Sequence, residues 1–79
     1  MATRRYTLTS SDITGRVGIS LRQLYYWELK GVIRPKVEQI GRRNFKRYSE
    51  EDLRVLREIK KLLDDGYTLE TAMRKARGG

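Results

Sequence analysis

The chain has 79 residues and contains neither cysteine nor histidine. This length allows one small domain with a modest core, and the composition excludes disulfide bonds, thiolate chemistry, imidazole bases and the usual zinc ligands. No apolar run approaches the roughly 20 residues of a membrane span, and no apolar segment of a signal peptide follows the basic N-terminus. We therefore expect a cytoplasmic protein without metal or cofactor.

The charge of the chain is unevenly distributed. Lys and Arg number 18 and Asp and Glu number 10, which gives a net charge of +8. Residues 1–48 contain 11 basic and 3 acidic side chains, whereas residues 49–79 contain 7 of each. A surface with such an excess attracts phosphate and accelerates association with polyanions. The distribution favours a nucleic-acid partner over a protein that is merely basic and soluble.

The first predicted helix covers residues 10–17. Thr9 is suited to cap its N-terminus, and Asp12 lies three residues later, where its carboxylate can reach back to the cap. Gly18 then permits a sharp turn. A short helix followed by such a turn is the first half of a helix-turn-helix unit.

The second predicted helix covers residues 21–30. Ser20 and Gln23 have the spacing of a second capping box, and Gly31 is a suitable residue to end the helix. Two helices around a tight glycine turn have the outline of a helix-turn-helix unit, although many helical hairpins share it.

Residues 33–48 predict a small two-stranded hairpin with a basic tip, called a wing. Pro35 disfavours helix before it, and residues 45–48 alternate aromatic and basic side chains at the period of a strand. Two strands alone are not stable in water, so we expect this hairpin to lean on the helices through Tyr48 and Val32.

Two further helices are predicted at the C-terminal end, over residues 50–64 and 69–77. Ser49 begins a third capping box with acidic residues in the first turn, and Thr68 can cap the last helix. Both helices are neutral and carry leucines at helical spacing, so they are interpreted as scaffold. The predicted fold is therefore mainly α: a single winged helix-turn-helix domain over residues 1–79, with four helices and a two-stranded wing.

The start of the helix over residues 21–30 carries side chains suited to DNA. Arg22 can bond guanine and Gln23 can bond adenine in the major groove, and tyrosine hydroxyls can bond phosphate. Adjacent helix positions point about 100° apart. We therefore expect one of Tyr25 and Tyr26 to be a packing residue and at least one to contact DNA.

The wing adds four cations within six positions, at residues 42, 43, 46 and 47. Cations on a protruding hairpin repel one another, so phosphate is their expected partner; the alternative is a flexible, solvated loop. The candidate DNA-binding residues are Arg16, Ser20, Arg22, Gln23, Tyr25, Tyr26, Arg42, Arg43, Asn44, Lys46 and Arg47, with Arg4 and Arg5 as a weaker additional arm.

Catalysis has little support in the sequence. No nucleophile–base pair is available without histidine and cysteine, and the acids at residues 50–52 are interpreted as helix-capping groups. Asp64 and Asp65 lack the ligand spacing of a calcium loop, and no glycine-rich phosphate loop is present. We expect the chain not to be an enzyme.

The sequence resembles the MerR family of transcriptional regulators over about residues 6–77. The stretches that carry the resemblance are residues 6–8 (Tyr-Thr-Leu), 17–20 (Val-Gly-Ile-Ser), 24–28 (Leu-Tyr-Tyr-Trp-Glu), 31–35 (Gly-Val-Ile-Arg-Pro) and 45–49 (Phe-Lys-Arg-Tyr-Ser). Tyr25 stands where most members carry arginine, and Trp27 replaces the usual second tyrosine. The pattern Gln-Leu-x-Tyr-Trp resembles a branch with heat-shock-repressor-like and actinobacterial members.

The resemblance implies a winged helix-turn-helix domain that binds double-stranded DNA at a promoter operator in the bacterial nucleoid, as a repressor or an activator. Arg22 and Gln23 would lie in the recognition helix, and Phe45, Lys46 and Tyr48 on the wing. Family members bind as dimers, and many bend the operator for RNA polymerase. Their dimerisation helix follows the fourth helix, so we expect this chain to be the isolated DNA-binding domain of a longer homodimeric protein.

Two alternatives to a regulator remain. An excisionase-type architectural protein shares this fold and binds several adjacent DNA sites. A protein–protein adaptor would instead use the neutral C-terminal helix pair. RNA binding is less favoured, because a two-stranded wing offers little surface for stacking bases.

Overall fold

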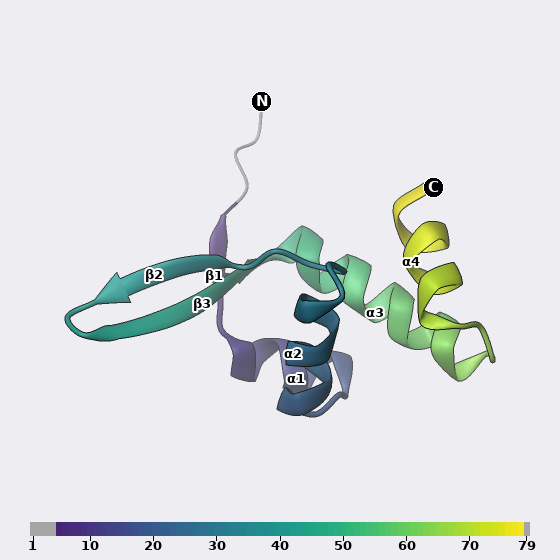
Figure 1. Ribbon diagram of the computed structural model, residues 1–79, viewed down its shortest axis with the longest axis horizontal. Coiled ribbons are helices and arrows are strands. Elements are labelled where there is room, and N and C mark those ends of the chain that lie inside the picture. Colours follow the sequence, from purple (N-terminus) through teal and green to yellow (C-terminus); the bar gives the residue numbers. More distant parts are fainter. Residues whose placement is uncertain (1–4, 79) are drawn as a thin grey trace.

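The computed structural model describes residues 5–78, which form four helices and a small antiparallel sheet (Figure 1). The elements in chain order are β1 (Tyr6–Leu8), α1 (Ser10–Val17), α2 (Leu21–Leu29), β2 (Lys36–Ile40), β3 (Arg43–Ser49), α3 (Glu50–Asp64) and α4 (Leu69–Gly78). No helix within this described part has the length and apolar character needed to cross a membrane.

The sheet has three strands in the order β1-β3-β2, one more than the sequence predicts. β1 pairs with the end of β3, with Tyr6 opposite Ser49 and Leu8 opposite Tyr48. A segment of three residues is too short for an alternating pattern to identify it as a strand. Its pairing supplies the support that an isolated hairpin lacks, and Leu8 is buried in the core.

The predicted helices are confirmed to within one residue at each end. α1 and α3 begin with complete capping boxes. The Thr9 hydroxyl accepts the Asp12 N–H while the Asp12 carboxylate accepts the Thr9 N–H, and Ser49 and Asp52 repeat this exchange. Each box satisfies two backbone donors that would otherwise lack a partner, which fixes where these helices begin.

The core lies where the helices meet the base of the sheet. α3 packs against α1 on one side and α4 on the other, while the β2–β3 hairpin extends away from the helices (Figure 1). The largest fully buried side chains are Trp27, Tyr48, Ile13, Leu24, Leu56 and Ile59. Tyr48 and Val32, the predicted contact points of the wing, are both buried.

Candidate nucleic-acid interface

The turn between α1 and α2 sets where α2 begins. Gly18 has a φ of +81°, a conformation that L side chains rarely adopt, and its N–H donates to the Thr14 carbonyl at 2.9 Å. The Ser20 hydroxyl then accepts the Gln23 N–H at 3.1 Å. Among the bonds of residues 5–78, the Gln23 side chain does not return a bond to Ser20, so the predicted capping box at α2 is only half formed.

The inner face of α2 is held by two core side chains. Leu24 and Trp27 are 0% and 1% exposed, respectively. Because the helix repeats every 3.6 residues, this anchoring turns the opposite face of the first turn outward. Arg22 is exposed and Gln23 is partly exposed, and the Arg22 side chain has no hydrogen-bond or ion-pair partner within the described part of the chain. The side chains suited to base contacts are therefore available at the N-terminal end of α2.

The two tyrosines of α2 both lie outside the core. Tyr25 and Tyr26 are 43% and 48% exposed. The prediction that one of the two is a packing residue is therefore wrong, because neither ring is buried. Each ring instead lies beside a lysine: Lys46 Nζ is 4.3 Å from the centroid of Tyr25, and Lys30 Nζ is 5.5 Å from that of Tyr26. These cation–π contacts hold both rings at the surface with a positive charge close by.

A buried carboxylate joins α2 to the wing. Glu28 Oε2 lies 2.6 Å from Lys46 Nζ, and its side chain is only 10% exposed. The Tyr48 hydroxyl donates to the other Glu28 oxygen, and Ser10 Oγ lies 3.5 Å from the same hydroxyl. Burial and the bond to Glu28 raise the pKa of Tyr48 well above its ordinary value. The network connects α1, α2 and β3, and sequence analysis did not identify the role of Glu28 in it.

The tip of the wing carries two arginines, Arg42 and Arg43. All of β2 is exposed, and β3 is exposed as far as residue 45. Arg42 and Arg43 form no ion pair with any carboxylate in residues 5–78. Lys46 and Arg47 do have carboxylate partners, the latter at 3.4 Å between Arg47 Nε and Glu38 Oε2. A phosphate partner for Arg42 and Arg43 stays a prediction.

A shallow hollow lies between the start of α1 and β3 of the wing. Its lining includes Ser10 and Ser11 from α1, Tyr25 from α2, and Asn44, Lys46 and Arg47 from β3. The fold thus brings together four predicted DNA-binding residues, namely Tyr25, Asn44, Lys46 and Arg47. They lie beside the hydroxyl groups of Ser10 and Ser11, which were not among the predicted site residues. The signal for Ser10 and Ser11 was present, since they open a helix next to a cap, but only the tertiary fold places them opposite the wing.

The remaining predicted cations lie elsewhere. Arg16 is exposed on α1, with its Nη1 3.9 Å from Glu50 Oε1 at the start of α3. Arg5 is exposed, and Arg4 lies outside the described residues. The structure therefore separates the candidate residues into the outer face of α2, the wing with its hollow, and Arg16 beside α3.

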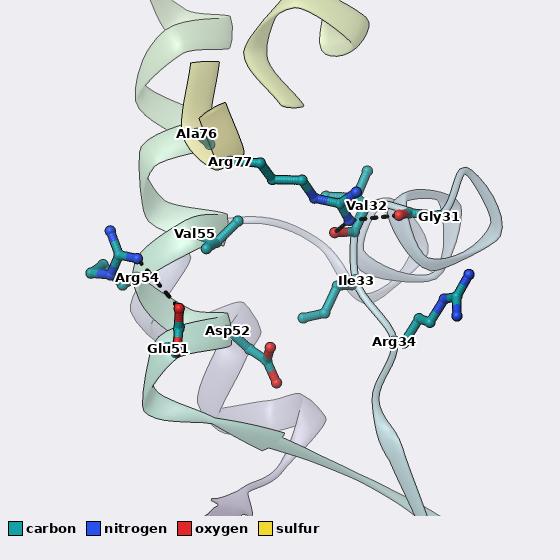
Figure 2. Close-up of a pocket in the computed structure, with 10 residues that line it drawn as sticks. All are labelled: Gly31, Val32, Ile33, Arg34, Glu51, Asp52, Arg54, Val55, Ala76 and Arg77. Carbon is teal, nitrogen blue, oxygen red and sulfur yellow. Dashed lines mark hydrogen bonds and ion pairs between the residues drawn. The ribbon is translucent and has the colours of Figure 1, made fainter. Parts of the chain in front are cut away.

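A second open pocket lies between residues 31–34, the first turns of α3 and the end of α4 (Figure 2). Arg77 extends across it from α4, and its Nη2 donates to the carbonyls of Gly31, at 2.8 Å, and of Val32. Arg54 and Glu51 form an ion pair on the α3 side, with Nη2 and Oε1 3.6 Å apart. This region lies far from the wing tip and was interpreted from the sequence only as scaffold.

Comparisons with known proteins identify the family. The family described as "MerR HTH family regulatory protein" matches residues 8–78. The chain belongs to the MerR family. Its winged helix-turn-helix fold is similar to the crystal structure of HiNmlR, described as a MerR family regulator lacking the sensor domain, bound to promoter DNA. The TM-score is 0.68 at 25% sequence identity.

The similarity to HiNmlR covers 90% of this chain and 52% of the HiNmlR chain, so this MerR-family chain spans about half of its structural relative. Comparison with curated proteins gives no match. The family and fold are those of helix-turn-helix regulators rather than of enzymes.

Proposed function

We propose that this chain is a sequence-specific DNA-binding domain of a MerR-like transcription regulator. In this proposal α2 lies in the major groove of double-stranded DNA, and the β2–β3 hairpin rests on the phosphate backbone. The observation that carries the proposal is the outward display of Arg22 and Gln23 at the start of α2, where recognition helices contact base edges. HiNmlR, the related regulator, is bound to promoter DNA in its crystal structure.

The candidate residues divide into three groups by the part of the DNA that each is proposed to contact. Arg22 and Gln23 read base edges, and Tyr25 and Tyr26 pack against sugars or thymine methyl groups. The remaining side chains contact phosphate, which positions the domain without reading sequence: Arg16, Ser20, Arg42, Arg43, Asn44, Lys46 and Arg47. Lys46 and Arg47 already have carboxylate partners, so Arg42 and Arg43 are expected to make the larger electrostatic contribution.

The proposal extends to the assembly. We propose that residues 1–79 form one domain, that it acts in the bacterial cytoplasm, and that it binds DNA as a homodimer. A dimer places two recognition helices on the two halves of a palindromic operator, where RNA polymerase becomes a further partner. A single domain with a small footprint binds weakly, so the dimer supplies much of the affinity.

Fluorescence anisotropy with two labelled duplexes tests the function. The chain is titrated into a duplex enriched by selection and into a random-sequence duplex of equal length, at several salt concentrations. We expect a steep salt dependence on both duplexes and tighter binding to the selected one. Arg57→Ala, which removes an exposed cation from α3, is the matched control and should leave the preference unchanged.

Three other outcomes would contradict the proposal. A steep salt dependence without preference would indicate a non-specific DNA-coating protein. A footprint extending over several adjacent sites would indicate an excisionase-type architectural protein. Absence of binding at low salt would exclude the nucleic-acid function and favour a protein–protein adaptor.

A further inference from the structure

The end of α2 is closed by a turn whose carbonyl groups point to another part of the molecule. After the last residue of α2, Gly31 has a φ of +80°. Its N–H donates to the Glu28 carbonyl, and the Val32 N–H donates to the Trp27 carbonyl, both at 3.0 Å. These two bonds, from N–H groups after the helix to carbonyls in its last turn, form the Schellman motif that ends many helices. The carbonyls of Gly31 and Val32 lie beyond it and take their partners from another part of the chain.

Arg77 supplies those partners from the last turn of α4. Its Nη2 donates to the Gly31 carbonyl at 2.8 Å and to the Val32 carbonyl. The side chain crosses the open pocket between α4 and residues 31–34 (Figure 2). A cation at the C-terminal end of a helix is also favoured by the helix dipole. The bonds join residues 46 and 45 positions apart in the chain.

The segment that Arg77 holds connects α2 to the wing. Val32 and Ile33 are buried at 2% and 5% exposure, and β2 begins at residue 36. The path of residues 31–35 therefore sets the direction in which the chain leaves α2 and enters the hairpin. α4 itself packs mainly on α3. The bonds of Arg77 therefore tie α4 to the segment between α2 and the wing.

We propose that Arg77 is a positioning residue for DNA recognition: it clamps the turn after α2 onto α4 and thereby fixes the relative placement of α2 and the wing. This inference rests on the proposed function for the identity of α2 as the recognition helix. The clamp itself is a property of the free protein and can be measured without DNA.

The decisive experiment is amide hydrogen exchange on the free protein, comparing Arg77→Ala with Arg74→Ala. Arg74 is an exposed cation about one turn earlier on α4, and its side chain has no hydrogen-bond partner among the described residues, so it is the matched control. Loss of the clamp should speed exchange of the Gly31 and Val32 amides by about tenfold, the effect of losing a charge-assisted hydrogen bond. The Ala72 amide, bonded to Thr68 within α4, should be unaffected in both variants.

Arg77→Lys provides a second variant that keeps the cation and a good helix former, and so keeps the fold. The path from the backbone to its ammonium is one bond shorter than the path to Arg77 Nη2, and the ammonium is more strongly hydrated, so exchange at Gly31 and Val32 should again be faster than in Arg74→Ala. Equal exchange in the Arg77 and Arg74 variants would overturn the proposal, whatever the DNA-binding result.

DNA binding then distinguishes positioning from direct contact. Loss of positioning should reduce the preference for the selected duplex several-fold and leave the salt slope unchanged. A salt slope reduced by about one unit, with unaltered exchange, would make Arg77 a phosphate contact instead. If the wild-type chain shows no sequence preference, the function proposed above fails while the exchange experiment still decides whether the clamp exists.

Discussion

Glu28 Oε2 lies 2.6 Å from Lys46 Nζ, and this ion pair joins α2 to the wing. The pair is asymmetric, because the Glu28 side chain is 10% exposed whereas that of Lys46 is 38% exposed. A largely buried carboxylate depends on its partners to offset the loss of hydration. The contact therefore couples the placement of the wing to that of the predicted recognition helix.

Replacing Lys46 tests this coupling. Among the contacts within residues 5–78, Lys46→Met leaves the largely buried Glu28 carboxylate with the Tyr48 hydroxyl as its remaining partner. We therefore expect the free energy of unfolding to fall by about 1–2 kcal/mol, discounted for the exposure of Lys46. Urea unfolding measures the change. Lys61→Met, at an exposed position on α3, is the control; equal effects of the two substitutions would show that the ion pair contributes nothing specific.

Arg22→Ala tests the base-reading role at the start of α2. We expect a loss of about 1–3 kcal/mol in binding to the selected duplex and a relaxed preference at one base position. Binding to random DNA should change less, because it depends mainly on phosphate contacts. Anisotropy titrations against single-base variants of the selected duplex measure both effects. A uniform weakening on all duplexes would assign Arg22 to the backbone.

Arg43→Ala tests the phosphate role of the wing tip. Since Arg43 has no internal carboxylate partner within residues 5–78, its charge is fully available to DNA. We expect weaker binding to all sequences alike and a salt slope reduced by about one unit. A salt series on the selected and random duplexes gives the slopes, with Arg57→Ala as the reference. An unchanged slope would leave the tip as a solvated loop.

Trp27→Ala tests the anchor of α2. The indole is 1% exposed in the core, and its removal should lower the free energy of unfolding by about 3–5 kcal/mol. Wild-type fluorescence, which reports on this single tryptophan, should have the blue-shifted maximum of a buried indole. A maximum typical of solvated tryptophan would contradict the packing of α2 described above.

Asp12 gives a prediction about pH. Its pKa lies below the ordinary 3.8 because its carboxylate accepts the Thr9 backbone N–H, with a further contribution from the Thr9 hydroxyl. A carboxyl whose pKa is lowered by folding stabilises the protein above its unfolded pKa, and this stabilisation is lost as the pH falls through the folded pKa. NMR titration should locate the Asp12 midpoint below 3.8.

The corresponding variant is Asp12→Asn. It should lower stability at neutral pH and should also reduce the loss of stability between neutral pH and about pH 2. Glu58→Gln, an exposed carboxyl in the middle of α3, should leave that pH dependence nearly unchanged. An Asp12 midpoint at or above its ordinary value would contradict the capping interaction.

Several features could be predicted from the sequence because they depend on neighbouring residues. Helix starts at Thr9 and Ser49 follow from a capping side chain and an acid three residues later, a pattern contained within one turn. The left-handed turn at Gly18 follows from a residue without a Cβ. The uneven charge and these elements together were enough to predict a winged helix-turn-helix domain.

Contacts between distant segments could be decided only by the tertiary structure. β1 has three residues and exists because it pairs with β3, which no local pattern indicates. Glu28 becomes a link to the wing because the fold places Lys46 beside it, and Arg77 becomes a clamp because α4 ends opposite the turn after α2. The physical reason is common to all three: local propensity and periodicity determine which face an element buries, whereas the partner that meets this face depends on how the whole chain packs.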